Sequence, residues 1–309
     1  MSEIQTVGIV GAGLMGTGIA EVAVIAGLDT ILVKATGGSP DDARRRIEKS
    51  LGRAVERGKL GSDARDDALS RLRVTGDRDA LGAADVIVES IVEDLPRKQA
   101  LFADLTAIAR PDAIFASNTS TLRISDMAAL RPARTIGTHF FSPVPAMKLV
   151  ELVHLPGTEA DVIDAATVFL VRMGKTVVPV MDSSGFVVNR LLVPFLVGAI
   201  AAFEQGLAKP EEIDTAMRLG CGHPMGPLAL SDLIGLDVVY AMSKLLFAEF
   251  HHVRFSPPSL LRRLVQQGQL GKKAGVGFYD YRRDPVTANE EVWNLVRAGA
   301  FGELREHAA

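Results

Sequence analysis

The sequence TVGIVGAGLMGTGIAEVAVIA, residues 6–26, predicts a strand, a glycine turn and a helix in direct succession. Its first five residues are mainly apolar and β-branched, as in a buried strand. The GxGxxG pattern of residues 11–16 follows at once, and the helix is expected to begin at Leu14. Glycines at this spacing permit a tight turn and let a pyrophosphate approach the backbone, where the first helix amides face its charge. The stretch favours a dinucleotide site over a plain packing turn, with Gly11, Gly13 and Gly16 at the phosphates and Leu14 and Met15 as further cofactor contacts.

Short β-rich runs alternate with helical stretches in the first part of the chain, which is typical of a mostly parallel sheet. Residues 40–72 carry charges spaced for two amphipathic helices, and after Gly185 helical signals replace strand signals. We expect a Rossmann-type α/β domain with a mostly parallel sheet and a helical-hairpin insert over residues 1–184, followed by an all-α C-terminal domain over residues 185–309. The expected strands are residues 6–10, 30–33, 85–90, 113–118, 134–140, 147–153 and 176–180.

The composition agrees with a two-domain globular protein. The chain has 309 residues, of which 48% are hydrophobic, and its net charge is −3 with acids and bases mixed along it. Nothing in that balance suggests binding to nucleic acid or to a membrane surface. The single cysteine, Cys221, excludes an intramolecular disulfide and is expected to be packed and inert. Without a signal peptide or a long apolar run, the protein is expected in the cytoplasm. His251 and His252 lack further spaced ligands, so no metal site is expected.

The residue after the second expected strand bears on the choice of cofactor. Dinucleotide folds that select NAD usually place an acid there to bind the ribose 2′-hydroxyl. This sequence has Lys34 instead, and Asp29 lies at the wrong end of the strand. Lys34, with Thr36 or Ser39, has the chemistry to attract a 2′-phosphate, although one lysine lacks the bidentate fork of arginine. NAD is the first choice and NADP the alternative; otherwise Lys34 is a solvated lysine beside an NAD site.

One histidine and one glutamate stand in apolar surroundings in HFFSPVPAMKLVELV, residues 139–153. His139 ends one expected strand, and the carboxyl ends of strands are where open α/β sheets bind ligands. Glu151 lies within the next strand, where a buried carboxylate is costly without a partner. If the two strands are adjacent, the glutamate reaches the imidazole and stabilises it after it has taken up a proton. The alternatives are a core histidine and an edge-strand glutamate paired with a lysine such as Lys148.

Several further blocks carry a family resemblance. In the same order as in 3-hydroxyacyl-CoA dehydrogenases, in particular the bacterial 3-hydroxybutyryl-CoA dehydrogenases, the chain has VGIVGAGLMGTGIAEVA, VIVESIVEDLPRKQALF, FASNTSTL, GTHFFSPVPAMKLVELV, SSGFVVNRLLVPFL, IDTAMRLGCGHPMGPLALSDLIGLD and GKKAGVGFYDY. The resemblance runs from Val7 to about Tyr281 and is far more specific than the glycine turn alone.

The resemblance implies roles for individual residues. The catalytic pair of the family falls on His139 and Glu151, and its polar groups around the reacting carbon fall on Ser120 and Asn189. Cofactor contacts beyond the glycine turn would be Glu93, Lys98, Asn118, Ser120, Ser142 and Lys273. The insert would meet the phosphates of coenzyme A through Ser50, Arg57 and Lys59.

The implied reaction is hydride transfer between a nicotinamide and C3 of a short 3-hydroxyacyl-CoA, in a homodimer formed through the C-terminal helices. Three positions depart from the family pattern: Lys34, Ser142 in place of an asparagine, and Ser184 in place of a proline. These departures leave open a 3-hydroxyacyl group on an acyl carrier protein, or a free 3-hydroxy acid of the carnitine or gulonate type. A non-enzymatic structural protein on the same scaffold is the remaining alternative.

Overall fold

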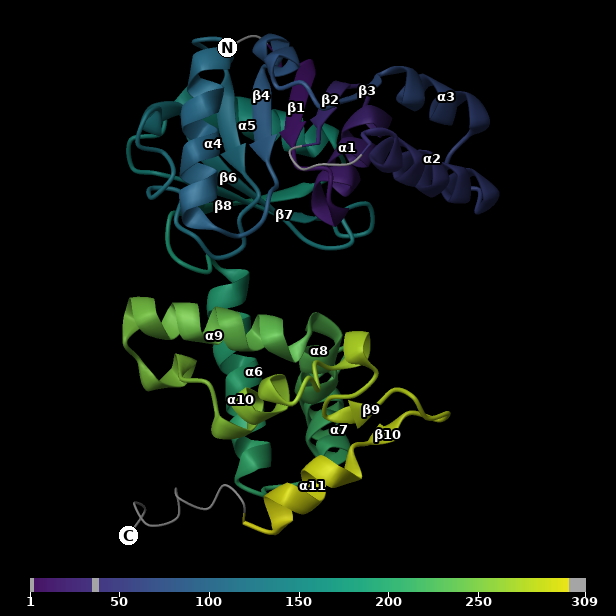
Figure 1. The fold of residues 1–309 in the computed structure, drawn as a ribbon, viewed down its shortest axis with the longest axis vertical. Helices are drawn as coiled ribbons and strands as arrows, with labels where there is room; N and C mark the ends of the chain where they lie inside the picture. Colours follow the sequence, from purple (N-terminus) through teal and green to yellow (C-terminus); the bar gives the residue numbers. More distant parts are fainter. Residues whose placement is uncertain (1–2, 35–38, 300–309) are drawn as a thin grey trace. The chain divides into compact units, whose positions relative to one another are not determined.

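The computed structural model describes residues 3–34 and 39–299 (Figure 1). Contacts within the chain define two compact units, Met1–Phe186 and Val187–Ala309. The first is a sheet with helices on both faces, and the second is mainly helical. Among the described residues, no helix is both long and apolar enough to cross a lipid bilayer.

The first unit is built on an eight-stranded sheet in the order β3-β2-β1-β4-β5-β6-β7-β8. In this sheet β6 and β7 are antiparallel, and all other neighbouring strands are parallel. The predicted mostly parallel sheet is therefore confirmed, and each expected run overlaps a strand. β3 is absent from the expected set, because LRVT is only a short run at the end of a polar insert. The strands are β1 (Thr6–Val10), β2 (Asp29–Val33), β3 (Leu72–Thr75), β4 (Val86–Glu89), β5 (Ile114–Ser117), β6 (Thr135–Phe140), β7 (Leu149–His154) and β8 (Thr176–Met181).

Helices bury both faces of this sheet because its strands are apolar on both sides. Val7 and Ile9 of β1 belong to a core cluster shared with α1 (Leu14–Ile25) and α5 (Ala160–Arg172). The alternate residue Val10 belongs to a second cluster, which α4 (Leu95–Ile108) completes from the other face. Such continuous apolar runs are what a parallel sheet covered on both faces requires. Short 3₁₀ turns, η1 (Asp79–Ala83) and η2 (Pro132–Arg134), lie in the connections.

The insert forms the expected pair of helices, α2 (Asp41–Glu56) and α3 (Ser62–Ser70). Figure 1 shows them side by side at the β3 end of the sheet. Ala43, Ile47 and Leu51 of α2 are buried in the first core cluster, whereas most other residues of the helix are charged. This apolar stripe attaches the hairpin to α1, and its polar faces remain at the surface.

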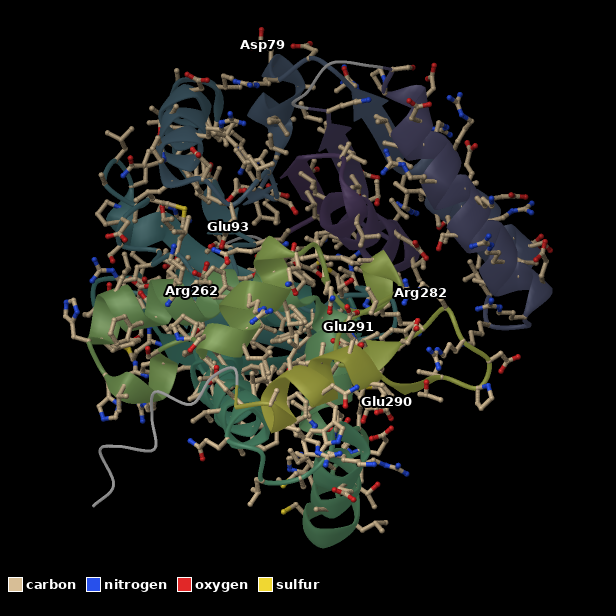
Figure 2. All side chains as sticks on the ribbon, turned by 60° about the horizontal axis from the view of Figure 1, so that its bottom comes forward. Asp79, Glu93, Arg262, Arg282, Glu290 and Glu291 are labelled. Carbon is tan, nitrogen blue, oxygen red and sulfur yellow. The ribbon has the colours of Figure 1, made fainter. Side chains whose placement is uncertain are left out.

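The second unit is centred on α6 (Val188–Glu204). Leu196, Ile200 and Phe203 of this helix lie in one core cluster. The helix α11 (Glu290–Arg297) packs on the same core, since the ring of Trp293 stacks on Phe203 with centroids 5.8 Å apart. Glu290 and Glu291 occupy its first turn, where carboxylates interact favourably with the helix dipole (Figure 2). The other helices are α7 (Pro210–Cys221), α8 (Pro227–Ile234), α9 (Leu236–Phe250), α10 (Ser259–Gln266), and the 3₁₀ turns η3 (Val253–Phe255) and η4 (Lys272–Ala274).

The predicted helical C-terminal domain is confirmed, but two details of the second unit differ from the expectation. It is not purely helical, because β9 (Tyr279–Asp280) and β10 (Thr287–Ala288) form a small antiparallel ribbon. Strands of two residues leave no periodic pattern in a sequence, which is why they escape prediction. Cys221 is exposed rather than packed, because it is the last residue of α7 and is followed by a glycine C-cap.

Candidate active site

Steric requirements define the glycine turn between β1 and α1. Gly11 has a φ of +116°, and a Cβ there would lie 2.2 Å from the carbonyl oxygen of Ser90. A Cβ at Gly16 would lie 1.7 Å from the carbonyl oxygen of Gly11, so α1 packs directly on the turn. At Gly13, by contrast, a Cβ would have no heavy atom of the described residues within 4 Å. The turn is closed against the protein on one side and has room for a ligand on the other.

Polar groups from the neighbouring strands gather at this same edge of the sheet. β1, β4, β5 and β6 are parallel, so their carboxyl ends lie together. Asn118 directly follows β5, and its Oδ1 accepts a hydrogen bond of 2.9 Å from the backbone amide of Phe140. Its Nδ2 donates to Oγ of Ser90, at 3.3 Å, in the loop after β4. The expected cofactor residue Asn118 therefore joins three strand ends that surround the glycine turn.

His139 and Glu151 meet at the carboxyl end of β6. The two residues are opposite one another in the antiparallel β6–β7 pair, and Nδ1 of His139 lies 2.7 Å from Oε2 of Glu151. His139 is 4% exposed and Glu151 is 1% exposed. The ring centroid of Phe141 lies 4.4 Å from that of the imidazole, so the pair is sheltered from water. When Nδ1 donates a hydrogen bond to this carboxylate, Nε2 is the ring nitrogen left to take up a proton.

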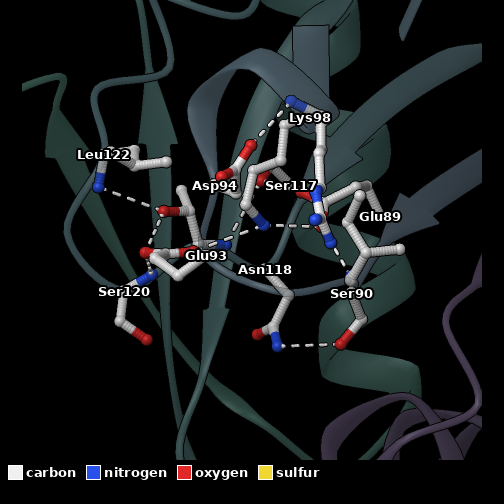
Figure 3. Close-up of polar contacts among 12 residues, drawn as sticks. Glu89, Ser90, Glu93, Asp94, Lys98, Ser117, Asn118, Ser120 and Leu122 are labelled. Carbon is white, nitrogen blue, oxygen red and sulfur yellow. Dashed lines mark hydrogen bonds and ion pairs between the residues drawn. The ribbon is translucent and has the colours of Figure 1, made fainter. Parts of the chain in front are cut away.

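Glu93 organises the loop that carries Ser120. Its Oε1 accepts hydrogen bonds from Oγ1 of Thr119 at 2.6 Å, from the amide of Ser120 at 3.0 Å and from the amide of Thr121 at 3.1 Å (Figure 3). Burial alone raises the pKa of Glu93, but the charge of Lys98 and these hydrogen bonds lower it below its usual value overall. The carboxylate is thus held ionised and fixes the backbone on which Ser120 stands.

Lys98 is buried rather than exposed at the start of α4. It is 1% exposed, and its Nζ lies 2.6 Å from Oε1 of Glu89 and 3.3 Å from Oε2 of Glu93. Glu89, the last residue of β4, is fully buried and also accepts from the amide of Ile91 at 2.7 Å. Figure 3 shows this ion pair beside Ser90 and Asn118. Lys98 therefore stabilises the site through its ion pairs with Glu89 and Glu93. Its contact with the cofactor stays a prediction.

The sequence argument missed Glu89 and Lys175, although both support the site. An acid at the end of the apolar run VIVE was the available signal for Glu89. Lys175 donates from Nζ to the carbonyl oxygens of Val144 and Met147, and its burial lowers its pKa. It thereby holds the loop between β6 and β7, where Ser142 is exposed. Ser184, the other departure near this region, is buried.

The residues expected to meet coenzyme A lie on and after α2. Oγ of Ser50 donates to Oε1 of Glu21 on α1, at 2.9 Å. Arg57 and Lys59 are exposed at the end of the hairpin helix. Burial raises the pKa of Glu21, and the hydrogen bond from Ser50 offsets part of that effect. Ser50 is thus tied to the first unit, while the two cations face solvent.

Two predicted site residues belong to the second unit. Asn189 lies in the first turn of α6 and is 8% exposed. Lys273 lies in η4 and pairs with Asp237 of α9, with Nζ 2.6 Å from Oδ1. Their roles toward the reacting groups stay predictions.

A cavity of about 610 Å³ adjoins the glycine turn. Gly11 and Gly13 line it together with residues of the loop after β4 and of α4. Its charged lining, among the described residues, consists of Lys34, Arg46, Arg78, Arg97 and Asp104. The size is that of a typical small-molecule site.

Comparisons with known proteins agree with this arrangement. Residues 6–183 match the family model for the 3-hydroxyacyl-CoA dehydrogenase NAD binding domain, and residues 185–281 match that for the 3-hydroxyacyl-CoA dehydrogenase C-terminal domain. The chain is 46% identical over 282 residues to 3-hydroxybutyryl-CoA dehydrogenase of Mycobacterium tuberculosis, covering 90% of this chain and 99% of the relative. It is 40% identical over 281 residues to a probable 3-hydroxybutyryl-CoA dehydrogenase of Bacillus subtilis, covering 90% and 98%.

Solved structures show the same similarity. The structure of (S)-3-hydroxybutyryl-CoA dehydrogenase PaaH1 from Ralstonia eutropha is 40% identical, with a TM-score of 0.87 over 90% of this chain and 99% of that one. The structure of FadB2 from M. tuberculosis is 45% identical, with a TM-score of 0.87 over 91% and 100%. With both domain models matched over most of its length, the chain belongs to the 3-hydroxyacyl-CoA dehydrogenase family of nicotinamide-dependent oxidoreductases.

Proposed function

We propose that this enzyme interconverts a short-chain 3-hydroxyacyl-CoA and its 3-oxoacyl counterpart, with 3-hydroxybutyryl-CoA as the preferred substrate. The observation that carries the proposal is the buried pair of His139 and Glu151 at the sheet edge that also holds the glycine turn. The relatives named 3-hydroxybutyryl-CoA dehydrogenase support the short acyl chain.

The glycine turn fits a nicotinamide dinucleotide. Gly13 is the N-cap of α1, and no side chain of the described residues caps this helix, so the amides of its first turn suit a pyrophosphate. Side chains at Gly11 or Gly16 would collide with backbone, so these residues keep the turn tight. When bound, the nicotinamide accepts or donates the hydride at its C4 atom. The proposed set of cofactor residues also includes Leu14, Met15, Lys34, Glu93, Lys98, Asn118, Ser120, Ser142 and Lys273.

His139 acts as the proton carrier. In the oxidative direction its Nε2 removes the proton of the 3-hydroxyl group, and in the reductive direction it returns that proton to the carbonyl oxygen. Glu151 keeps Nδ1 protonated and stabilises the imidazolium, because the two side chains share a buried hydrogen bond. A carboxylate in this position also prevents the ring from turning.

Ser120 and Asn189 are proposed to hold the oxygen at C3 of the substrate. Hydrogen bonds aimed at an oxygen that gains negative charge stabilise the transition state. The bonds from residues 119–121 to Glu93 support this role for Ser120, since they fix the loop that carries it.

The remaining assignments concern the whole protein. We propose a dinucleotide-binding domain over residues 1–184 and a substrate and dimerisation domain over residues 185–309. Ser50, Arg57 and Lys59 would meet the phosphates of coenzyme A, and the dimer would form through the C-terminal helices. The single cysteine supports a location in the cytoplasm.

The test is reduction of acetoacetyl-CoA, followed at the absorbance band of the reduced nicotinamide. We expect turnover with acetoacetyl-CoA and lower kcat/KM with the same acyl group on an acyl carrier protein or as the free acid. Faster turnover of the carrier-bound or free acid would replace coenzyme A as the proposed carrier. No turnover with any of the three substrates would contradict the proposed function.

A further inference from the structure

We propose that the cavity beside the glycine turn contains a subsite for the 2′-phosphate of NADP(H), so that the enzyme uses NADP(H) at least as efficiently as NAD(H). The inference rests on the proposed function and extends it to the adenosine end of the cofactor. It is carried by the position of Lys34, by the cations around it and by the continuity of the cavity with the glycine turn.

Lys34 occupies the position at which a carboxylate would bind the 2′-hydroxyl of the adenosine ribose. It follows β2 directly, and its amide donates to the carbonyl oxygen of Thr75 at the end of β3, at 2.9 Å. The preceding residue, Val33, accepts from the amide of Gly11, also at 2.9 Å. These two bonds fix the backbone of Lys34 beside the turn that would bind the pyrophosphate. The position of the ribose-binding acid is thus occupied by a cation that lines the cavity.

Two arginines from other elements line the same cavity. Arg46 projects from α2, and Arg78 immediately precedes η1. Arginine supplies the planar fork for two-point phosphate binding that a single lysine lacks. The sequence alone identified Lys34 but no arginine near it. The fold brings two arginines, Arg46 and Arg78, to the same cavity.

The charges in the cavity are poorly balanced. Among the described residues, the lining has four cations and one carboxylate, and that carboxylate, Asp104, pairs with Arg78 at 2.8 Å. Among the described residues, Nε of Arg46 donates to the backbone oxygen of Asp42, at 3.3 Å, and Nζ of Lys34 donates to that of Ser39, at 3.2 Å. No carboxylate of the described residues therefore neutralises either cation. A phosphate dianion would supply the missing charge and accept hydrogen bonds from both. Thr36, also considered for this contact, lies outside the described residues.

The same cavity is lined by the glycine turn and by Lys34. A dinucleotide whose pyrophosphate meets the turn at Gly11 and Gly13 can therefore extend its adenosine toward Lys34. The alternative is that an arginine plane stacks on adenine and the cations remain solvated. That arrangement gives no preference for a 2′-phosphate. The two arrangements therefore predict different ratios of kcat/KM for NADPH and NADH.

The experiment compares kcat/KM for NADPH and NADH with acetoacetyl-CoA in the wild type and in Lys34→Glu. We expect a wild-type NADPH/NADH ratio of at least about one, and a fall of that ratio by roughly 10- to 100-fold in Lys34→Glu, as for loss of a charged hydrogen bond. Arg46→Gln and Arg78→Gln should each lower it by about 10-fold. Lys49→Glu is the matched control, because Lys49 is exposed on α2 outside the cavity lining, and its ratio should stay within about twofold of the wild type.

A binding measurement makes the test independent of catalysis. Calorimetric titration with 2′,5′-ADP and with ADP should give tighter binding of the former in the wild type, and this difference should vanish in Lys34→Glu. A wild-type preference for NADH of tenfold or more, or an unchanged ratio in Lys34→Glu, would overturn the subsite. If neither nucleotide supports turnover, the proposed function fails, while the titration still decides whether the subsite exists.

Discussion

His139 and Glu151 form a cross-strand pair, and their side chains share a buried hydrogen bond of 2.7 Å. In a β-sheet, residues opposite one another in an antiparallel pair project to the same face, so backbone register alone brings imidazole and carboxylate together. Burial of both groups makes this contact stronger than one exposed to water. The relationship ties the proposed chemistry to the pairing of β6 and β7.

Replacing the imidazole tests its role directly. His139→Gln should lower kcat by about 10² to 10⁴, the usual contribution of a general acid-base group. The dissociation constant of NADH, measured by fluorescence titration, should remain near the wild-type value. His154→Gln is the control, because His154 ends β7 outside the proposed machinery. Near-normal turnover in His139→Gln would remove His139 from the mechanism.

The partner carboxylate has a smaller expected effect. Glu151→Gln keeps an acceptor for Nδ1 but removes the negative charge, so kcat should fall about 10-fold, the difference between a charged and a neutral hydrogen bond. Glu151→Ala loses the acceptor as well and should approach the rate of His139→Gln. Equal rates for the Gln and Ala variants would mean that the charge and the orientation of Glu151 are not separate contributions.

Substitution of Gly16 should lower stability, whereas substitution of Gly13 in the same turn should weaken cofactor binding. Gly16→Ala places a Cβ 1.7 Å from the carbonyl oxygen of Gly11, and we expect a loss of about 3 kcal/mol or more in the free energy of unfolding. Gly13→Ala enters open space and should cost less than about 1 kcal/mol. Its added methyl group should instead raise the KM for the cofactor about 10-fold or more, by crowding the pyrophosphate. Urea unfolding and initial rates measure the two effects, and a normal KM in Gly13→Ala would place the pyrophosphate elsewhere.

The buried ion pair of Lys98 with Glu89 should contribute mainly to the free energy of unfolding. Lys98→Met leaves Glu89 buried without its cation and should cost about 3–5 kcal/mol in urea unfolding. Arg97→Met, at the neighbouring exposed position, should change the free energy of unfolding by less than about 0.5 kcal/mol. The double variant Lys98→Met with Glu89→Gln should recover part of the loss, because it removes both charges. A Lys98→Met protein as stable as Arg97→Met would show that the buried charge is compensated in another way.

The features predicted from sequence are those that local rules determine. The glycine turn follows from steric limits within residues 11–16, and the pairing of His139 with Glu151 follows from strand alternation and a short connection. The contact of Lys98 with Glu89 depends on how α4 packs against β4, which no local pattern records. The convergence of Arg46 and Arg78 on Lys34 likewise depends on three separate segments meeting at one cavity.

Glu21 should give the protein a pH-dependent stability. Burial raises its pKa in the folded state above that in the unfolded chain, so folding favours the protonated carboxyl group. The stability from this group is fully present below the ordinary pKa of a glutamate and is lost as pH rises through the raised value. Glu21→Gln is neutral at every pH and keeps an acceptor for Ser50. Its Tm should therefore exceed that of the wild type by a few degrees at pH 7 to 8, with a much smaller difference near pH 4.

Glu56→Gln, on the exposed end of α2, is the control and should leave Tm unchanged at both pH values. A Tm gain for Glu21→Gln that is equal at both pH values would mean that ionisation of Glu21 is not the cause.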